Sequence, residues 1–263
     1  MSLLRLFKRQ TGFLMPSGAG LRRGQDRLLH RLGLRRTRDP LPLITDPKLT
    51  YGSVLPLAIS DALHDQPDFT FLQIGAYDGL AHDDLHGVIA RHALRGVLVE
   101  PHPSAFSRLK SLHGDDRRLT LLNAAIDHRA GTRELYSPPR ADTQLASFDP
   151  SHVMRAGFGR DELNTHQVDC LTIDDALRLG GLQEVDLLHI NAGGHDHEIL
   201  ASLDLDRVRP SLIRFEHRFA PRGELNACLA RLSRYGYRFH AEPHSVIAIG
   251  KRRRAAPALR LAA

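Results

Sequence analysis

The stretch Phe71-Leu-Gln-Ile-Gly-Ala-Tyr-Asp-Gly79 decides the fold of this chain of 263 residues. Its first part is an apolar, β-rich run, and its second part is bounded by glycines, which let the backbone turn tightly and approach a ligand closely. We therefore predict a buried strand that ends in a ligand-facing turn. The glycine spacing is not G-x-G-x-x-G, which disfavours a dinucleotide, and the turn lacks the Gly-Lys-Ser/Thr end of a phosphate-binding loop.

Strands and helices alternate outward from this stretch. The hydrophobic pattern predicts strands at 69–74, 96–100, 119–126, 185–190 and 211–216, helices at 51–64, 83–94, 104–112, 171–179, 196–203 and 224–235, and a closing antiparallel pair at 237–240 and 246–249. Strands separated by helices favour a doubly wound α/β domain around a mainly parallel seven-stranded sheet with an antiparallel last strand. Residues 131–136 suggest a small hairpin arm, and 137–168, with weak periodicity and several loop formers, suggest a mobile or lid-like region.

Basic residues are concentrated at both ends. The formal net charge is +6, the first 38 residues hold ten arginines and lysines, and Lys251-Arg-Arg-Arg254 closes the chain. We predict a partly flexible basic arm at 1–48, the main domain at 49–250 and a basic tail at 251–263. Aromatic residues do not interleave with the basic ones in the way that a single-strand binder requires, so nucleic acid is not an expected partner. Leucines beside Arg5 and Lys8 leave open a peripheral membrane contact of the arm.

The composition favours a cytoplasmic protein. The chain has two cysteines, Cys170 and Cys228, which fit no disulfide framework and no metal spacing, and this suggests a reducing compartment. No apolar run approaches the roughly 20 residues that span a bilayer, and the basic residues near Met1 do not suit a secretory signal. The sequence leaves the oligomeric state open.

Two further strand ends complete a predicted ligand site. Glu100 ends the second strand, where an acid can accept hydrogen bonds from both hydroxyls of a ribose, and Pro101 then stops the strand. The third strand runs into Asn123-Ala-Ala-Ile126, whose small residues leave room for a flat base and whose asparagine can contact the edge of that base. Because ligands of such sheets bind at the carboxyl ends of the strands, these features predict one connected site.

Several blocks together resemble a known family, the FkbM-type methyltransferases. These blocks are 71–79, Gly96-Val-Leu-Val-Glu-Pro101, Asn123-Ala-Ala-Ile126, Asp186-Leu-Leu-His-Ile190 with 194–200, and Leu212-Ile-Arg-Phe-Glu-His217. Any one block is a weak signal, but their order and spacing over residues 68–217 are fairly specific.

The resemblance implies a class I methyltransferase fold that uses S-adenosylmethionine to O-methylate a hydroxyl on a sugar, glycan or natural-product acceptor. By matching position, it assigns the methionine part of the cofactor to the turn, the ribose to Glu100 and the adenine to Asn123 and Ala124. The predicted cofactor-binding set is Gln73, Gly75, Ala76, Asp78, Gly79, Glu100, Pro101, Asn123 and Ala124. Asp83 and Asp84 either cap the next helix, which we favour, or contact the amino group of the cofactor.

One block departs from the family pattern, which has the form Ile-Asp-x-Glu-Gly-x-Asp after the fourth strand. Asn191 and Gly193 stand where that pattern has acids. We therefore expect His195 or Asp196 to act as the base that removes the hydroxyl proton, with Glu216 or His217 orienting the acceptor. We predict no metal site, since His195 and His197 point to different faces of a helix.

The missing acids also favour an alternative function, in which the chain binds the cofactor but acts as an interaction or structural protein. A nicotinamide-dependent oxidoreductase is less favoured because of the glycine spacing. An amino-group methyltransferase acting on nucleic acid is less favoured still, because the sequence has no Asn/Asp-Pro-Pro-aromatic motif.

Overall fold

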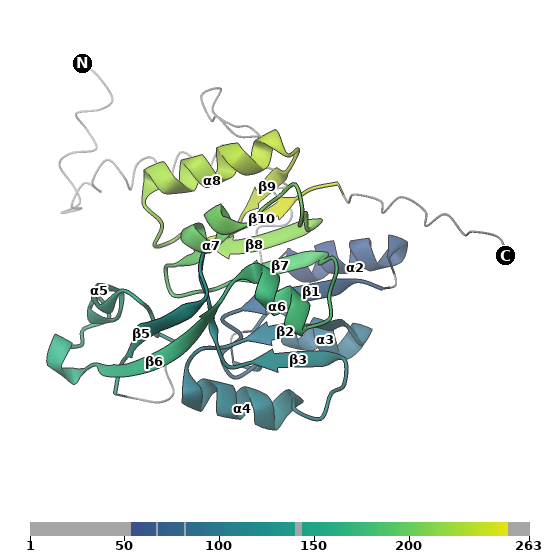
Figure 1. Ribbon diagram of the computed structural model, residues 1–263. Coiled ribbons are helices and arrows are strands. Elements are labelled where there is room, and N and C mark those ends of the chain that lie inside the picture. The colour runs from purple at the N-terminus through teal and green to yellow at the C-terminus, as the bar shows by residue number, and fades with distance from the viewer. Residues whose placement is uncertain (1–53, 67, 82, 140–143, 252–263) are drawn as a thin grey trace, which may run out of the picture. The chain divides into compact units, whose positions relative to one another are not determined.

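The computed structural model describes residues 54–66, 68–81, 83–139 and 144–251. Within them a seven-stranded sheet has the order β3-β2-β1-β7-β8-β10-β9 (Figure 1). Its strands are β1 (Thr70–Ile74), β2 (Arg95–Val99), β3 (Leu119–Leu122), β7 (Leu187–Ile190), β8 (Leu212–Glu216), β9 (Arg238–Ala241) and β10 (Ser245–Ile249). The first five are parallel, whereas β10 is antiparallel to both β8 and β9. The predicted mainly parallel sheet with an antiparallel last strand is confirmed.

The strand order reverses between β1 and β7. From β1 the chain moves outward to β2 and β3, and it later returns to build β7 and β8 on the other side of β1. All four residues of β7 and four of the five in β1 are buried. In open sheets of this kind ligands bind beyond the carboxyl ends of the strands at such a reversal. The topology therefore fixes where a site should lie.

Helices cover both faces of this sheet. They are α2 (Leu55–Asp65), α3 (His86–His92), α4 (Pro103–His113), α6 (Ile173–Leu179), α7 (Asp196–Ser202) and α8 (Arg222–Arg234). In Figure 1, α6 and α7 lie in front of the sheet and α2 and α3 behind it. Local sequence sets several of these starts: Pro103 occupies the first turn of α4, and Thr172 and Asp175 form a capping box before α6.

A second, three-stranded sheet forms an arm beside the main one. It has the order β4-β6-β5, from β4 (Ala125–Ile126), β5 (Gly131–Ser137) and β6 (Asn164–Leu171), and it carries the short helix α5 (Pro150–Met154). The prediction of one strand over 119–126 was therefore wrong. The strand ends at Leu122, and residues 125–126 pair with β6 in the arm. A single polar residue, Asn123, lies in this break between apolar neighbours, so the hydrophobic pattern did not reveal it.

The prediction of a lid-like region at 137–168 was also wrong for most of its length. It contains α5, a 3₁₀ turn (Arg160–Glu162) and most of β6, which pairs antiparallel with β5 from Gly131↔Cys170 to Ser137↔Asn164. Only Val168 and Cys170 of β6 are buried, and its first four residues are exposed or half-buried on both faces, so the alternation that marks a strand covers only its end.

Other predicted segments lie outside the described residues: the basic arm at 1–48, residues 140–143 and the tail beyond Lys251. The helix predicted at 83–94 is shorter at its start, since α3 begins after Leu85. The side chain of Asp83 accepts a hydrogen bond from the N–H of Leu85, the N-cap residue of α3, at 2.8 Å, so Asp83 contacts the start of the helix from just before it. None of the helices in the described ranges combines the length and apolarity needed to cross a bilayer.

Candidate active-site cavity

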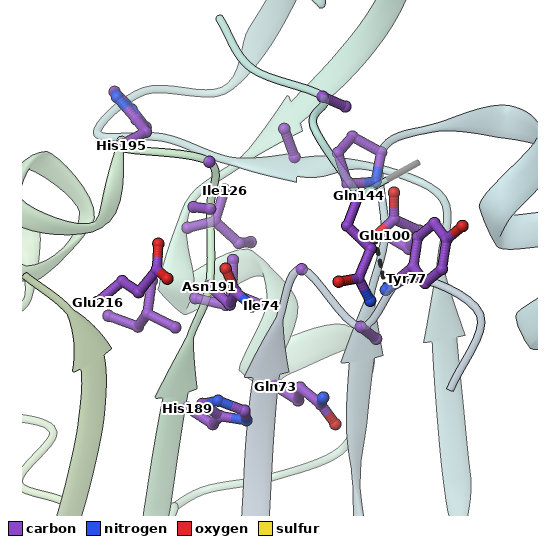
Figure 2. Close-up of a pocket in the computed structure, with 18 of the residues that line it drawn as sticks. Gln73, Ile74, Tyr77, Glu100, Ile126, Gln144, His189, Asn191, His195 and Glu216 are labelled. Atoms are coloured by element: carbon purple, nitrogen blue, oxygen red, sulfur yellow. Dashed lines mark hydrogen bonds between the residues drawn. The ribbon is translucent and has the colours of Figure 1, made fainter. Parts of the chain in front are cut away.

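A cavity lies at the carboxyl ends of β1 and β7, where the strand order reverses (Figure 2). Its walls come from the turn after β1, the turn after β2, β4, the segment 144–148, the turn after β7 and the end of β8. Six segments far apart in the sequence therefore meet around one space, as the topology predicts.

The turn after β1 is held tightly between its neighbours. The N–H groups of Gly75 and Ala76 both donate to the carbonyl of Val99, at 2.9 and 3.0 Å. Gly75 has a φ of +78°, and a Cβ added there would lie 1.9 Å from the carbonyl oxygen of Asn191. Only glycine fits this position, because any side chain would collide with the end of β7.

Glu100 brings a buried carboxyl group to the cavity. Its side chain is 5% exposed, and its two oxygens accept hydrogen bonds from the N–H groups of Tyr77 and His102, each at 2.8 Å (Figure 2, dashed line for Tyr77). Burial raises its pKa to about 7, although the two N–H groups act in the opposite direction. This carboxyl therefore titrates near neutrality, and when ionised it is a strong acceptor facing the cavity.

The predicted cofactor-binding residues divide into two groups. Those on the cavity wall are Gln73, Gly75, Ala76, Glu100 and Pro101. The other four predicted residues, all within the described ranges, do not line the cavity: Asp78, Gly79, Asn123 and Ala124.

The second group has structural contacts instead. Asp78 accepts hydrogen bonds from the N–H groups of Leu80 and Ala81, and Gly79 packs on α4. The side-chain amide of Asn123 donates to the carbonyls of Glu100 and Pro101, so it braces the turn after β2. Ala125 and Ile126, one step further along the same small-residue run, line the cavity.

The four predicted catalytic residues also differ in position. His195 and Glu216 line the cavity. Asp196 is buried, and its two oxygens accept from the N–H groups of Ala192, at 3.1 Å, and Glu216, at 2.9 Å. Burial raises the pKa of Asp196 to about 6 against the effect of these bonds. Asp196 thus ties the turn after β7 to the end of β8. His217 packs against the carbonyl of Glu242, away from the cavity wall.

His195 lies between two carboxylates. Its Nε2 is 3.3 Å from Asp127 and its Nδ1 is 3.5 Å from Glu198. Burial would lower the pKa of His195, but these two carboxylates outweigh burial and raise it. Burial likewise opposes ionisation of Asp127, yet hydrogen bonds from Arg133 and His128 hold its pKa well below the usual range. His195 therefore has an ionised partner that fixes its ring. Sequence reasoning missed Asp127, although it directly follows the small-residue run.

An open groove meets the cavity at His195. Phe148, Gly193 and His195 line both spaces. The groove then runs between α5, α7 and the start of α8, and it carries charged groups of both signs, including Asp149, Arg155, Glu198 and Glu224, beside the ring of Phe219. His195 thus stands where a ligand in the cavity and a second ligand in the groove would meet.

Gly193 lies at a close contact between the main sheet and the segment 144–148 beside the arm. Its φ is +57°, and a Cβ there would lie 2.3 Å from the carbonyl oxygen of Ala146. The hydroxyl of Ser147 donates to the carbonyl of Gly193 at 2.7 Å. The acid of the family pattern is thus replaced by a close contact between two backbones, which a longer side chain would prevent. Asn191, the other altered position, lines the cavity (Figure 2). Among the described residues, no three His, Cys, Asp or Glu side chains are placed to hold a metal ion.

The fold, a mainly parallel seven-stranded sheet with an antiparallel last strand, is that of class I methyltransferases. The chain belongs to the FkbM methyltransferase domain family, whose model matches residues 73–239. No protein of curated function matches the sequence at a significant level.

Solved structures that resemble the chain include three methyltransferases. A methyltransferase FkbM from Methylobacillus flagellatus has 12% identity and a TM-score of 0.45, with 70% of this chain and 44% of that chain covered. A precorrin-6y C5,15-methyltransferase from Geobacter metallireducens has 15% identity and a TM-score of 0.39, covering 80% and 94%. A SAM-dependent O-methyltransferase from Thermotoga maritima has 11% identity and a TM-score of 0.38, covering 88% and 73%. The chain thus spans less than half the length of the Methylobacillus protein.

Proposed function

We propose that the chain binds S-adenosylmethionine and transfers its methyl group to a hydroxyl of a sugar, glycan or natural-product acceptor. The observation that carries this proposal is the buried carboxyl of Glu100, which faces the same cavity as the tight turn at Gly75. An ionised carboxylate there suits the two hydroxyls of a ribose, and the turn allows close approach of a ligand to backbone. The residues present therefore fit this cofactor.

The cavity wall suggests how the cofactor would be held. Glu100 would bind the ribose, and the backbone around Gly75 and Ala76 would face the sulfur side. Ala125 and Ile126 would pack on the adenine, in the place that the sequence assigned to Asn123 and Ala124. When bound, S-adenosylmethionine supplies an electrophilic methyl group.

In this proposal Nε2–H of His195 donates to Asp127, which leaves the lone pair of Nδ1 to remove the proton of the acceptor hydroxyl. His195 lies on the wall shared by the cavity and the groove, and Asp127 and Glu198 stabilise the imidazolium that would form. Glu216, also on the wall, would orient the acceptor, and Asp196 would hold the two strand ends that carry these groups. Alignment of the acceptor oxygen with the methyl group would supply several kcal/mol, up to roughly 7–11 kcal/mol, of the rate acceleration.

The groove would hold the acceptor. Its carboxylates can accept hydrogen bonds from hydroxyl groups, Arg155 can donate, and Phe219 offers an apolar surface to a sugar ring. Both signs of charge line the groove, which favours a neutral polyhydroxylated acceptor over a strongly charged one.

Calorimetric titration with S-adenosylhomocysteine tests the cofactor assignment. The wild type should bind it, and Glu100→Gln should bind about ten- to hundredfold more weakly, because a charge-assisted hydrogen-bond pair is lost. Glu134→Gln, at an exposed position on β5, is the matched control and should bind as the wild type. Binding of a nicotinamide cofactor without any binding of S-adenosylhomocysteine would overturn the proposal.

A second candidate function is cofactor binding without methyl transfer. It is favoured by Asn191 and by the backbone contact at Gly193, which stand where the family pattern has acids. Transfer of a radiolabelled methyl group to a panel of hydroxylated glycans separates the two. Label incorporation that disappears in His195→Gln supports the enzyme, and cofactor binding without incorporation supports the second candidate.

A further inference from the structure

Three polar side chains lie in one row across the middle of the main sheet. Gln73, His189 and Arg214 are paired in register on β1, β7 and β8, so they share one face. The same row continues with Leu98 on β2 and Ile247 on β10. Central strands of a sheet covered on both faces are normally apolar, so this polar interruption needs an explanation. All three side chains line the active-site cavity, and Figure 2 shows Gln73 and His189 below the strand ends.

His189 offers an unused donor to the cavity. Its ring is 4% exposed, and its Nε2 lies 2.7 Å from the guanidinium of Arg214. A guanidinium can only donate, so Nε2 accepts and the proton sits on Nδ1. Burial and the charge of Arg214 lower the pKa of His189 to about 3, so the ring is neutral. The Nδ1–H group has no hydrogen-bond partner among the described residues.

Gln73 offers an unused acceptor beside it. Its side chain is 2% exposed, and its Nε2 donates to Asp83 at 3.1 Å, which identifies Oε1 as the remaining atom. That oxygen also has no partner among the described residues. Buried polar groups in folded proteins are nearly always paired. A neighbouring donor and acceptor that both lack partners therefore indicate a ligand that carries both kinds of group.

The surrounding charges favour a cation next to Gln73. Arg214 is the positive group of the row, and it pairs with Asp84 at 2.8 Å and lies 3.3 Å from Glu242. Asp83 adds a third carboxyl group, and both Asp83 and Asp84 line the cavity. The guanidinium pairs with Asp84 and Glu242, while Asp83 accepts from Gln73 and from the N–H of Leu85. A ligand ammonium beside Gln73 would therefore balance the negative charge of these carboxyl groups.

We propose that this row receives the amino-acid end of the methyl donor, an inference that rests on the proposed function. Gln73 Oε1, with Asp83 and Asp84, accepts hydrogen bonds from the α-ammonium, and His189 Nδ1 donates to the α-carboxylate. A zwitterion satisfies both buried atoms at once and places its cation beside the carboxyl groups of Asp83 and Asp84, whereas a purely anionic group leaves Gln73 Oε1 without a donor.

The test compares two ligands that differ only at that end. S-adenosylhomocysteine carries the α-amino acid, and 5′-methylthioadenosine keeps the adenosine and the thioether but lacks it. In calorimetric titrations, His189→Phe and Gln73→Met should each bind S-adenosylhomocysteine at least about tenfold more weakly. Both should bind 5′-methylthioadenosine within about twofold of the wild type, which also shows that the variant is folded. His189→Gln, which keeps a donor, should recover part of the loss.

His240→Phe is the matched control, because His240 is a buried histidine that extends the same row on β9 and lies outside the cavity wall. Variants that bind S-adenosylhomocysteine like the wild type, or that lose both ligands equally, overturn the inference while leaving the proposed function intact. A wild type that binds neither ligand overturns the proposed function and this inference together. If His189→Phe does not fold, Gln73→Met and His189→Gln make the same comparison.

Discussion

For Glu100, the ionised form that favours ligand binding is also the form that lowers the stability of the fold. The pKa of Glu100 is raised from an ordinary 4.5 to about 7 in the folded chain, so the folded state binds the proton more tightly than the unfolded state. Its favourable contribution is therefore complete below pH 4.5 and is lost as the pH rises through 7. The charged form that suits a ribose is the form that the fold tolerates least.

The Glu100→Gln variant should for this reason be more stable than the wild type at pH 8. A shift from 4.5 to about 7 corresponds to roughly 3 kcal/mol, and the amide has no such titration. Urea unfolding between pH 4 and 8.5 measures it. The difference in the free energy of unfolding between variant and wild type should grow from pH 4.5 to about 7 and then level off. A difference that does not change with pH would contradict the assignment.

Protonation of His195 should lower the methyl-transfer rate at acidic pH and so produce the acidic limb of the pH–rate profile. His195 must be neutral to accept a proton, and Asp127 and Glu198 raise its pKa above the ordinary 6.5, so the rate should rise with pH through a midpoint above 6.5. Asp127→Asn and Glu198→Gln should move that midpoint to lower pH. His195→Gln should lose about 10²- to 10⁴-fold in rate.

The matched variant is Glu216→Gln, because the pKa of Glu216 is also raised by burial. It should lower the rate but keep the limb, which pH–rate profiles with an acceptor from the glycan panel will show. Disappearance of the limb in Glu216→Gln, with its persistence in His195→Gln, would assign the base to Glu216 instead.

At the residue scale, sequence could locate groups at the ends of strands but not groups within them. Gly75 and Glu100 follow apolar runs directly, so a parallel sheet brings them to one edge. His189 and Arg214 lie inside β7 and β8, and their meeting depends on a register that no local pattern encodes. Asn123 was predicted to contact a base, but its amide donates to the carbonyls of Glu100 and Pro101, a contact that depends on backbone geometry.

At the element scale, the main feature is the contact between the turn after β7 and the segment 144–149. Gly193→Ala should destabilise the chain by about 1–3 kcal/mol from its left-handed backbone alone, and by more because the new Cβ would lie 2.3 Å from the carbonyl of Ala146. Urea unfolding measures the loss, and acceptor turnover should fall as the groove wall moves.

Gly236→Ala separates these two causes. Its φ is +86°, but an added Cβ there meets no atom of the described residues within 4 Å. This control has the same kind of backbone strain without the collision. Equal destabilisation of the two variants would show that the contact at Ala146 contributes nothing.

Elements of the main sheet were predictable because each is a short apolar run bounded by turn formers. The strands of the arm were not, for two physical reasons. The break after Leu122 is marked by one polar residue, Asn123, within a mostly apolar segment, and β6 buries only Val168 and Cys170. The pairing of β6 with β5 spans the whole of α5, so no short-range signal announces it.

At the scale of the whole molecule, one ligand should stabilise both sheets. The cavity wall includes Gly75 in the main sheet and Ala146 and Phe148 beside the arm. S-adenosylhomocysteine at 100 times its Kd should therefore raise the free energy of unfolding by about 2.7 kcal/mol. Hydrogen exchange should slow at 75–81 and at 144–148 together. Slowing at 75–81 alone would show that the arm does not share the cavity, and exchange at β9 serves as the internal reference.

The pairing of Gly131 with Cys170 has a consequence for how such a chain can diversify. The segment between them, which carries α5 and one side of the groove, begins and ends at paired residues, so its two ends stay adjacent whatever lies between them. Segments with adjacent ends are tolerated sites of insertion and replacement. Recombination among relatives could thus exchange residues 131–170 as a cassette, giving a new acceptor preference on an inherited donor site.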